Sequence, residues 1–506
     1  MTGRGGKPGS RTPAGSRGAA VVGSGPNGLA AAVTLARAGV PVTVFEAEAT
    51  IGGGTRTEET TLPGVLHDVC SAIHPMALAS PFFRAFGLSE RIELVVPEAS
   101  YGHPLDPADG RGGIAYRDLD RTAAELGADG PAFRRLFRPV LRRIDGVVDA
   151  AQGGSMLRVP RDPLAFAALG LRVLERGTVA SGLRFREPAA HAMIEGVAAH
   201  SIARMPSLGS AGVGVVLAAL AHAGGWPVPV GGSRVISAAL ADDLLAHGGR
   251  IETDTRIASL DGLRDRGGFD AVIFDTSARA LARIAGEALP AGYRRRLERF
   301  RYGPGSCKVD FVLDGPVPWR DERMHAAPTV HLGGTAAEVR DAENRVLRGE
   351  HAQRPFVLLA QTDGFDPGRN PAGSHAIWSY AHVPAGSSRD VREAVIAQIE
   401  RFAPGFRDRI RAVSVTTADR LGEHNANYVG GDIASGAVSL AQLLARPVLS
   451  PQPWRTPAPG LFLASSSTPP GPGVHGMSGY LSARLALAEV FGLPVPELAP
   501  GAPSAS

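Results

Sequence analysis

The hydrophobic pattern near the N-terminus predicts one βαβ unit. Residues 19–22 read Ala-Ala-Val-Val, an apolar run typical of a buried strand. After a glycine-rich turn, residues 29–38 form an alanine-rich stretch that stops at Gly39, and residues 40–45 are apolar again. Strand, helix and strand in this order favour parallel pairing, because a helical crossover brings the second strand back beside the first.

The pattern changes along the rest of the chain. From about residue 101 to 224 it is largely helical, with helices expected at 163–174 and 187–203. From about 225 it returns to α/β, with a helix at 235–247 and strands at 250–252, near 256–260 and at 271–274. β-branched and aromatic residues predict strands at 307–313, 356–361 and 376–383, before a last strand at 460–464 and a helix at 479–490.

Two domains are expected, because 506 residues exceed what one hydrophobic core usually holds. The α/β pattern assigns residues 18–100, 225–300 and 455–492 to one discontinuous domain, and residues 101–224 and 301–454 to the other. Residues 1–17 and 493–506 are expected to be disordered tails, because they are rich in small residues and proline.

Composition and charge narrow the function classes. The net charge of +4 comes almost entirely from arginine, since Lys7 and Lys308 are the only lysines, and no dense basic run contains aromatic residues. Nucleic-acid binding is therefore not expected. The two cysteines, Cys70 and Cys307, form no Cys-x-x-Cys motif, which argues against a disulfide pair and fits a reducing cytoplasm. No Cys/His cluster has metal-ligand spacing, so no metal site is expected.

Membrane insertion is not predicted. No stretch of the chain reaches the roughly 18 to 20 apolar residues that a membrane-spanning helix needs. Residues 1–17 contain arginines and a lysine but no apolar core, so a secretory signal is not expected either. A cytoplasmic protein is the resulting expectation.

The turn after the first strand carries a dinucleotide-binding fingerprint, Gly23-Ser24-Gly25-Pro26-Asn27-Gly28. Gly23 permits the tight turn, Gly25 lets the backbone approach a pyrophosphate, and Gly28 lets the helix pack against the strand. The N-terminus of that helix is expected to offer free N–H groups to the diphosphate. Glu46 follows the second strand, where a carboxylate accepts hydrogen bonds from a ribose diol.

A second match, Gly471-Pro-Gly473-Val-His-Gly476, also follows an apolar strand and precedes a helix. Too little chain follows it to supply a second strand and an acid. It is therefore not interpreted as a separate nicotinamide-dinucleotide site.

The segment that follows Glu46 carries a resemblance to a known family. Gly52-Gly53-x-x-Arg56-Thr57 after a glycine fingerprint resembles FAD enzymes of the glutathione-reductase-like fold, in particular the phytoene desaturase, amine oxidase and retinol saturase group. The resemblance implies FAD as cofactor and an α/β, glutathione-reductase-like two-domain flavoprotein with a Rossmann-like FAD domain and an α+β substrate domain. It implies FAD contacts at Ala47, Gly53, Gly54, Thr55 and Arg56, and a backbone contact of Ile257 with the adenine.

Two later segments resemble one branch of that group. Tyr302–Trp319 and the region from Leu461 to Val490 are similar to phytoene-dehydrogenase-like proteins, including those named for a pyridine nucleotide-disulfide oxidoreductase domain. The resemblance implies that Gly473, Val474, His475, Gly476 and Met477 lie by the isoalloxazine ring. A helix N-terminus there would stabilise the anionic reduced ring. Ser465, Ser466 and Ser467 stand where many flavoproteins have an acid for the ribityl chain.

Lys308 and His475 are the candidate catalytic residues. Lys308 stands where the resemblance to amine oxidases implies a lysine that holds a water against flavin N5, and strand alternation places it on one face with Asp310. The alternatives are a solvated face or a Lys308–Asp310 pair. His475 would relay a proton or, alternatively, cap the backbone.

Several other side chains have two open interpretations. His74 is a weaker candidate for the site. Trp378, Tyr380 and His382 alternate on one strand face and suit either a cavity wall or a plain core. Arg56 would reach the diphosphate or the ribityl region, and its alternative is a surface arginine.

The sequence thus predicts an FAD-dependent oxidoreductase that removes hydride from a C–C or C–N bond of an apolar small molecule, such as a polyene or terpenoid. A flavin amine oxidase and a non-catalytic flavin-binding protein are the alternatives. The apolar helices of residues 150–224 suggest a lipid-facing entrance and loose peripheral membrane contact. No pattern in the sequence specifies an oligomeric state.

Overall fold

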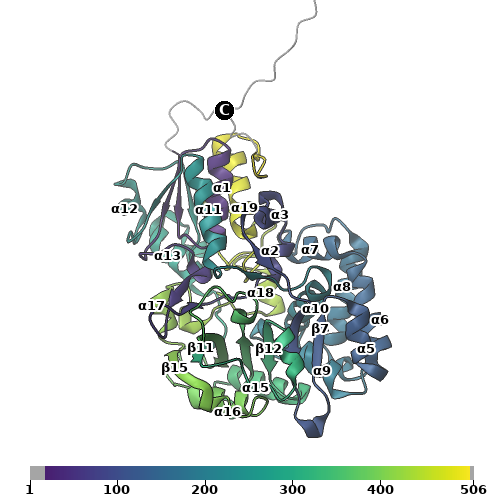
Figure 1. Cartoon of the computed structure of the whole chain (residues 1–506). Helices are drawn as coiled ribbons and strands as arrows, with labels where there is room; N and C mark the ends of the chain where they lie inside the picture. The colour runs from purple at the N-terminus through teal and green to yellow at the C-terminus, as the bar shows by residue number, and fades with distance from the viewer. Residues whose placement is uncertain (1–17, 502–506) are drawn as a thin grey trace, which may run out of the picture.

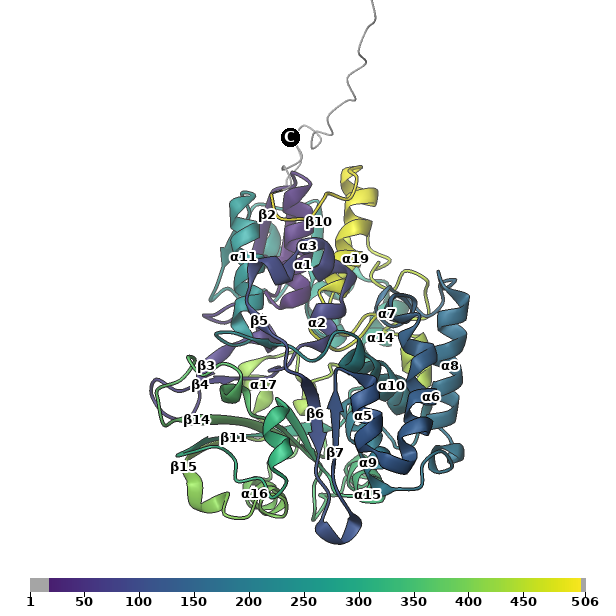
Figure 2. The same ribbon diagram turned by 45° about the vertical axis from the view of Figure 1, so that its right-hand side comes forward.

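The computed structural model describes residues 18–501, which fold into two domains, one above the other in Figure 1. The upper domain contains the first helix, the last helix and both ends of the described chain. The lower domain contains a large sheet with a helical layer at one end (Figure 2). Residues 1–17 and 502–506 lie outside the described residues.

The upper domain is built on a five-stranded parallel sheet. Its strand order is β16 (Leu461–Leu463), β10 (Ala271–Phe274), β1 (Ala19–Val22), β2 (Val42–Phe45) and β9 (Arg250–Glu252). The five strands come from all three segments assigned to this domain by the sequence. The predicted βαβ unit is present, with α1 (Pro26–Arg37) between β1 and β2.

Two apolar layers cover this sheet. Helices α1, α11 (Arg234–Ala246) and α19 (Met477–Ala486) lie side by side in Figure 1 and share one hydrophobic cluster. Helices α13 (Ala278–Ala285) and α14 (Ala291–Glu298) contribute to the cluster on the other side, next to α12 (Leu260–Arg264). Contact between α1 and α19 depends on Gly479, because a Cβ there would lie 1.7 Å from the carbonyl oxygen of Asn27.

The lower domain is built on a seven-stranded sheet. Its order is β15 (Ile410–Thr416), β11 (Gly305–Leu313), β14 (His375–Val383), β13 (Val357–Ala360), β12 (Thr329–Leu332), β6 (Ala99–His103) and β7 (Gly113–Tyr116). Neighbouring strands are antiparallel except β12 and β6. One face packs on α16 (Arg392–Glu400) in a large apolar cluster. The other face carries Trp378 and Tyr380 and contributes to a smaller cluster with α15 (Ala336–Leu347).

Helices stand beside the β6–β7 end of this sheet. They are α5 (Leu119–Glu125), α6 (Gly130–Leu141), α7 (Ile144–Gln152), α8 (Pro163–Arg176), α9 (Pro188–Ala198) and α10 (Leu208–Ala223). In Figure 2, α8 lies at the outer edge of the molecule. None of the helices described is both long and apolar enough to cross a membrane.

Short elements connect the two domains and complete the chain. They are β3 (Thr57–Glu59), β4 (Leu66–Asp68), β5 (Leu94–Val95), β8 (Val228–Pro229), α2 (Pro75–Ala79), α3 (Pro81–Phe86), α4 (Leu88–Arg91), α17 (Leu421–His424) and α18 (Leu440–Leu444). Short 3-10 turns lie between them, including η1 (Gly53–Thr55) and η5 (Ala199–Ser201).

Two sequence-based expectations are wrong. The strand near 256–260 is absent, since this segment has no sheet partner and α12 begins at its end. The region 101–224 is largely helical, as predicted, and it also contributes β6 and β7 to the large sheet. The second tail was expected to begin at 493, but Leu493 and Leu498 are buried in the core around α1. Arg37 also donates to the carbonyl oxygens of Glu497 and Ala499.

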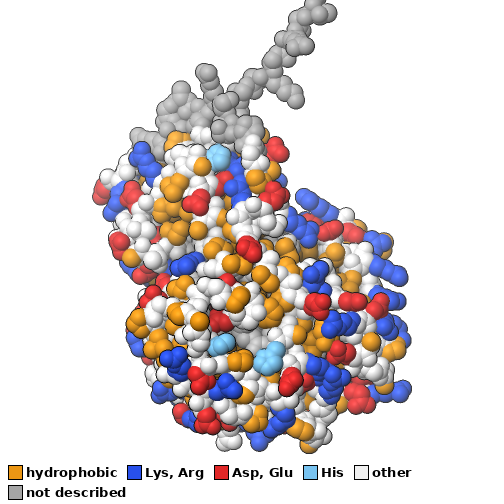
Figure 3. Space-filling model, viewed as in Figure 1, with side chains coloured by type: hydrophobic (Ala, Val, Ile, Leu, Met, Phe, Trp, Pro, Cys, Tyr) orange, Lys and Arg blue, Asp and Glu red, His pale blue; other side chains and the backbone are white. Residues whose placement is uncertain are grey.

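Charged side chains of both signs are interspersed on the surface. Figure 3 shows arginines beside acidic residues over the helical layer at the right of the view. Asp120, for example, pairs with Arg134 and Arg138, and Glu98 pairs with Arg121. This face therefore carries no broad region of a single charge.

Candidate functional site

A cavity of about 1100 Å³ extends from the end of the parallel sheet into the lower domain. Its first part is formed by the glycine loop after β1, the end of β2 and the turn after β16. Its deeper part lies between the sheet face of β12, β13 and β14 and the helices α8 and α10. One continuous space therefore joins the predicted dinucleotide loop to an apolar chamber.

The glycine loop after β1 lies directly against the turn at Gly52-Gly53. Gly23 has a φ of +103°, which favours glycine, and its N–H donates to the Phe45 carbonyl oxygen at 2.8 Å. A Cβ on Gly53 would lie 3.1 Å from the Cα of Gly25. Gly54 is also confined, since a Cβ added there would lie 2.7 Å from the Tyr428 hydroxyl oxygen. These glycines form the cradle that the fingerprint predicts.

Glu46 sits at the mouth of this cradle in a buried hydrogen-bond network. Its carboxylate accepts hydrogen bonds from the Ser24 N–H at 3.0 Å and the Ser24 hydroxyl at 2.5 Å. The Arg56 guanidinium lies 3.4 Å from the other oxygen and also donates to the carbonyls of Thr50 and His424. Arg56 is buried and lines the cavity, so its interpretation as a surface arginine is wrong.

The N-terminus of α1 differs from the expectation of free N–H groups. Pro26 has no N–H, and the N–H of Leu29 donates to the Gly25 carbonyl. The N–H of Gly28 donates to the Asp275 carboxylate at 2.9 Å. Within residues 18–501, the N–H of Asn27 is the one donor of this turn that remains for a ligand.

Of the other residues predicted to contact FAD, some line the cavity and some lie behind its wall. Ala47 and Ile257 line the cavity near Glu46, and Ile257 is buried against the cluster around α13. Thr55 does not line it and instead contacts the Ser237 hydroxyl. Gly28 is set back beneath Asp275, whose side chain lines the cavity.

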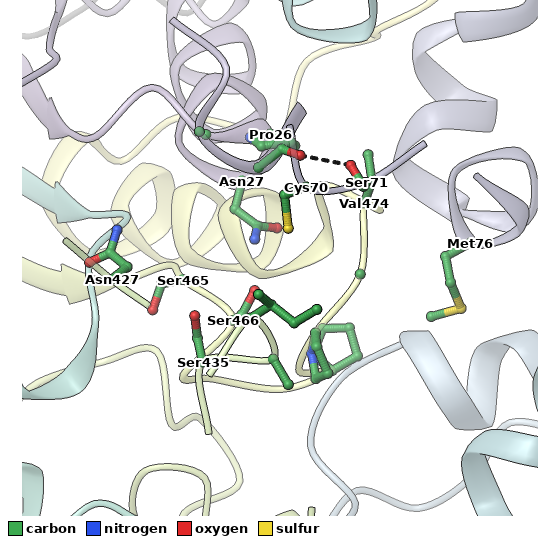
Figure 4. A pocket seen from close by; sticks show the side chains of 18 of the residues that line it. Pro26, Asn27, Cys70, Ser71, Met76, Asn427, Ser435, Ser465, Ser466 and Val474 are labelled. Atoms are coloured by element: carbon green, nitrogen blue, oxygen red, sulfur yellow. Dashed lines mark hydrogen bonds between the residues drawn. The ribbon is translucent and has the colours of Figure 1, made fainter. Parts of the chain in front are cut away.

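The turn before α19 forms another wall, with positive φ at Gly471, Gly473 and Gly476. Gly473 and Val474 line the cavity, whereas His475, Gly476 and Met477 lie behind them. Figure 4 shows the side chains of Asn27, Ser465 and Ser466 directed into the same pocket. The turn therefore brings hydroxyl groups to the cavity where an acid is common.

His475 caps the backbone. Its ring is fully buried, Nδ1 accepts the N–H of Met477 at 3.1 Å, and Nε2 lies 3.1 Å from the Gly471 carbonyl. Burial lowers the pKa of His475 to about 4, so the ring is neutral at pH 7. The structure thus gives the imidazole the backbone-capping position and no cavity surface.

Lys308 forms the predicted ion pair with Asp310, and both side chains are buried. The solvated-face alternative is wrong, because every residue of β11 is buried. Lys308 does not line the cavity; its ammonium lies 4.9 Å from the ring centroid of Trp378, which does. Burial lowers the pKa of Lys308, and the Asp310 carboxylate opposes that shift.

Aromatic residues on the sheet face the deeper chamber. Trp378 and Tyr380 line it, with ring centroids 5.1 Å apart and planes at 80°, so the cavity-wall interpretation is confirmed for both. His382 does not line it, because its Nδ1 is bonded to Glu343 at 2.8 Å. His74 also lines the cavity, where its Nε2 meets the Ser233 hydroxyl at 2.8 Å.

Sequence reasoning missed several residues of the site. Asp275 follows β10, Cys70 and Tyr428 lie beside Gly54, and Arg446 is buried against carbonyls of the 434–436 segment and Ser466. Their only sequence signal is their place in loops after strands or between short elements. Because their neighbours are far along the chain, periodicity and motif spacing could not identify them.

The site fits FAD on its own geometry. The cradle is closed to any Cβ at Gly25 and Gly53. Two buried polar atoms in the cavity wall, Asn27 Oδ1 and Thr276 Oγ1, have no hydrogen-bond partner within the described part of the chain. Such orphaned groups are costly unless a ligand or water satisfies them. Ser24, Glu46 and Arg56 would hold the adenosine side, and Val474 and the serines at 465–466 would face the flavin side.

Comparisons with known proteins agree with this geometry. The family described as flavin containing amine oxidoreductase matches residues 27–490. The chain is 26% identical to rat (Rattus norvegicus) pyridine nucleotide-disulfide oxidoreductase domain-containing protein 2, over 92% of each chain.

Solved structures share the fold at low identity. An oxidoreductase from Methanosarcina mazei has a TM-score of 0.57 at 16% identity, with 92% of this chain and 99% of that chain covered. Cyclohexylamine oxidase from Brevibacterium oxydans has a TM-score of 0.55 at 13% identity, with 94% and 98% covered. These similarities confirm the predicted α/β flavoprotein fold.

Proposed function

The chain belongs to the flavin containing amine oxidoreductase family, and we propose that this FAD-dependent oxidoreductase dehydrogenates a C–C bond of an apolar substrate such as a polyene or terpenoid, with a hydride leaving one carbon for the flavin and a proton leaving the adjacent carbon for solvent. FAD, when bound, supplies the hydride acceptor. The protein contributes a chamber that holds the substrate and excludes water.

The apolar lining of the deeper chamber is the observation that supports this proposal. Side chains from α8 and α10 face the sheet across the cavity: Phe166, Leu169, Val173, Val213, Val216 and Leu217. Trp226 closes one side with its ring fully buried. A substrate in this chamber would exchange water for hydrocarbon over most of its surface, which favours an apolar molecule.

The charges around the cavity favour a neutral substrate over a protonated amine. Among the described residues, the acids that line it are Glu46, Glu48 and Asp275, all at the dinucleotide end. None of these carboxylates lies in the deeper chamber to pair with an ammonium group; of the arginines that line the cavity, Arg158 is already paired with Asp149. Burial of an unpaired ammonium ion is costly, so dehydrogenation of a C–C bond fits better than amine oxidation.

We also propose that the substrate arrives from a membrane surface beside α8. All but two of its 14 residues are exposed or half-buried, and Leu164, Phe166, Leu171 and Leu174 have 46–61% of their surface in solvent. Phe166 and Leu174 also line the cavity, so the exposed apolar surface is continuous with the chamber. Patches of this kind on a monomer are commonly interaction sites.

Anaerobic flavin bleaching tests the reaction. Purified holoprotein would be mixed with polyenes, terpenoids and primary amines in parallel, and loss of the visible flavin band followed by stopped flow. Reduction by polyenes or terpenoids is expected. Reduction by amines alone would overturn the proposal in favour of an amine oxidase, and no reduction by any of them would favour a non-catalytic flavin protein.

A chamber-filling variant tests where the substrate binds. Gly212 on α10 lines the cavity, and a Cβ there meets nothing within 4 Å. Gly212→Leu should therefore keep the fold and slow flavin reduction by large substrates at least tenfold. Gly292→Leu on α14, a glycine with equal space away from the cavity, is the matched control and should react as the wild type does.

A further inference from the structure

Asp275 occupies the place where the diphosphate of a dinucleotide is expected. It follows β10, and its carboxylate accepts the N–H of Gly28 in the first turn of α1. A Cβ on Gly25 would lie 2.6 Å from Asp275 Oδ2, and a Cβ on Gly28 would lie 3.0 Å from the same atom. The second and third fingerprint glycines therefore make room for this side chain as well as for a ligand.

The same carboxyl group faces the cavity. Asp275 lines it together with Gly23, Ser24, Gly25, Pro26 and Asn27. Because Gly28 uses its N–H for Asp275, the positive end of α1 reaches a ligand chiefly through Asp275 and the N–H of Asn27. Whether this site accepts an anion thus depends on the state of that carboxyl group.

The surroundings of Asp275 are anionic rather than cationic. Glu46 faces it from the end of β2, and the first turn of α1 carries no charged side chain. Arg56, the nearest cation of the network, is engaged with Glu46. No cation pairs with Asp275 within the described part of the chain. Burial raises the pKa of Asp275 to about 7, with a contribution from Glu46, although hydrogen bonds from the backbone of Gly28 and Gly25 oppose the shift.

A diphosphate would bring further negative charge into this small space. An ionised Asp275 beside it would add like-charge repulsion in a desolvated site, whereas a protonated carboxyl group has an O–H to donate. The proton therefore changes Asp275 from a competitor for the helix N-terminus into a hydrogen-bond donor.

We propose that Asp275 binds the FAD diphosphate as the neutral acid, accepting the Gly28 N–H through one oxygen and donating from the other to a diphosphate oxygen. The proton comes from solvent, so one proton is taken up with each FAD wherever the free site is ionised. This proposal rests on FAD binding and not on the identity of the substrate. It can therefore fail while the proposed reaction holds, and the reverse is also true.

The consequence is proton-linked FAD affinity. Above about pH 7 the free site is ionised, and each further pH unit should weaken FAD binding about tenfold. Below pH 6 the affinity should level off. An asparagine at 275 would offer the same acceptor and donor without a titrating proton.

Equilibrium dialysis of the purified holoprotein between pH 6 and 9 tests this, with released FAD measured by its fluorescence. Wild type should lose FAD increasingly above pH 7, and Asp275→Asn should give a nearly flat profile. Asp363→Asn is the matched control, because Asp363 is a half-buried carboxyl group of raised pKa outside the cavity; it should behave as wild type.

Three results would overturn the proposal: a flat wild-type profile, an equal slope in Asp275→Asn, or loss of FAD from folded Asp275→Asn at every pH. Circular dichroism of Asp275→Asn establishes whether it is folded. If the variant is unfolded, the wild-type profile alone tests the proposal, since proton-linked binding requires FAD release from wild type to increase with pH.

Discussion

At the residue scale, the FAD end of the cavity is a set of buried polar groups that depend on one another. The buried carboxylate of Glu46 is stabilised by hydrogen bonds from Ser24 and Arg56. The buried guanidinium of Arg56 also donates hydrogen bonds to the carbonyl oxygens of Thr50 and His424. Removing one of these side chains leaves another buried polar group without its hydrogen-bond partner, so substitutions here affect cofactor binding and stability together.

Gly25→Ala should abolish tight FAD binding. The φ of Gly25 is −66°, which alanine adopts freely, so any effect comes from the added methyl group. That methyl group would lie 2.6 Å from Asp275 Oδ2 and displace the loop from the acid. The flavin-to-protein absorbance ratio after purification should fall at least tenfold. Gly292→Ala, with open space around its Cβ, should retain FAD; full FAD occupancy in Gly25→Ala would contradict the cradle.

Lys308→Met should destabilise the fold more than it alters the cavity. It leaves the buried Asp310 carboxylate with only His67 Nδ1, at 3.9 Å, as a nearby basic group. Breaking a buried pair from one side typically costs about 3–5 kcal/mol. Urea unfolding of the holoprotein should show a loss of that size.

The double variant Lys308→Met/Asp310→Leu should recover much of that loss, because it removes both charges. If the single and double variants were equally unstable, packing on β11 and not charge would explain the effect. A rate of flavin reduction unchanged in the double variant would show that Lys308 is not needed beside Trp378 for the reaction.

At the element scale, α8 carries more exposed large apolar side chains than the other described helices of the site. Leu164, Leu171 and Leu174 have 55–61% of their surface exposed on one short helix. A helix with apolar residues on its outer side gains by burying them in the interfacial region of a bilayer.

Replacing these three leucines with serine should remove membrane binding without unfolding the protein, because their side chains are largely in solvent. Flotation with vesicles containing phosphatidylglycerol should recover wild type in the lipid fraction and leave the triple variant in the protein fraction. Leu245→Ser/Leu347→Ser, which changes exposed leucines on α11 and α15, is the control and should float. Wild type that does not float would refute the membrane-supply proposal.

The elements that sequence predicted well are those with a strong local signal. The βαβ unit has buried apolar strands and a glycine turn, and β11 and β14 have long runs of strand-forming residues. β6 and β7 were missed because a sheet partner from another segment, β12, stabilises a short strand inside a helical region. Likewise, residues 493–501 have the composition of a disordered tail, yet two leucines of this segment are buried in the core around α1.

At the scale of the whole molecule, the glycine loop of the cofactor site could be predicted from the sequence. The residues that the fold brings to this loop from distant parts of the chain could not. The fingerprint and Gly52-Gly53-x-x-Arg56 identify the loop because their spacing carries the chemistry. Asp275 is 247 positions from Gly28, and no local pattern links them. Only the parallel pairing of β1 with β10 brings the acid to the loop.

The pH dependence of stability is also a property of the whole fold, because buried histidines are spread over both domains. Burial lowers the pKa of His74, His103, His222 and His475 to about 4 and that of His200 to about 3. These rings are neutral in the native state, whereas in the unfolded chain they take up protons near pH 6.5. Their contribution to stability is full above pH 6.5 and is lost as the pH falls towards 4.

Asp275 acts in the opposite direction. Its folded-state pKa, raised to about 7, lies above the unfolded value of about 3.9, so its penalty on stability decreases as the pH falls through the same range. The pKa values of Asp363 and Asp432 are also raised by burial, but the five histidines outnumber these carboxyl groups, which leaves a net loss of stability in acid. The melting temperature of the holoprotein should therefore fall steeply between pH 6.5 and 4.5.

Each group contributes at most about 1.4 kcal/mol per pH unit, and Asp275→Asn removes one of the opposing contributions. The slope of stability against pH should thus be steeper in Asp275→Asn than in wild type by up to that amount, measured by urea unfolding at several pH values. A wild-type melting temperature that stayed constant from pH 6.5 to 4.5 would mean that these histidines are protonated in the folded state as they are in the unfolded chain. An equal or shallower slope in Asp275→Asn would mean that Asp275 is ionised in the folded state, and its assignment as the neutral partner of the diphosphate would then fail with it.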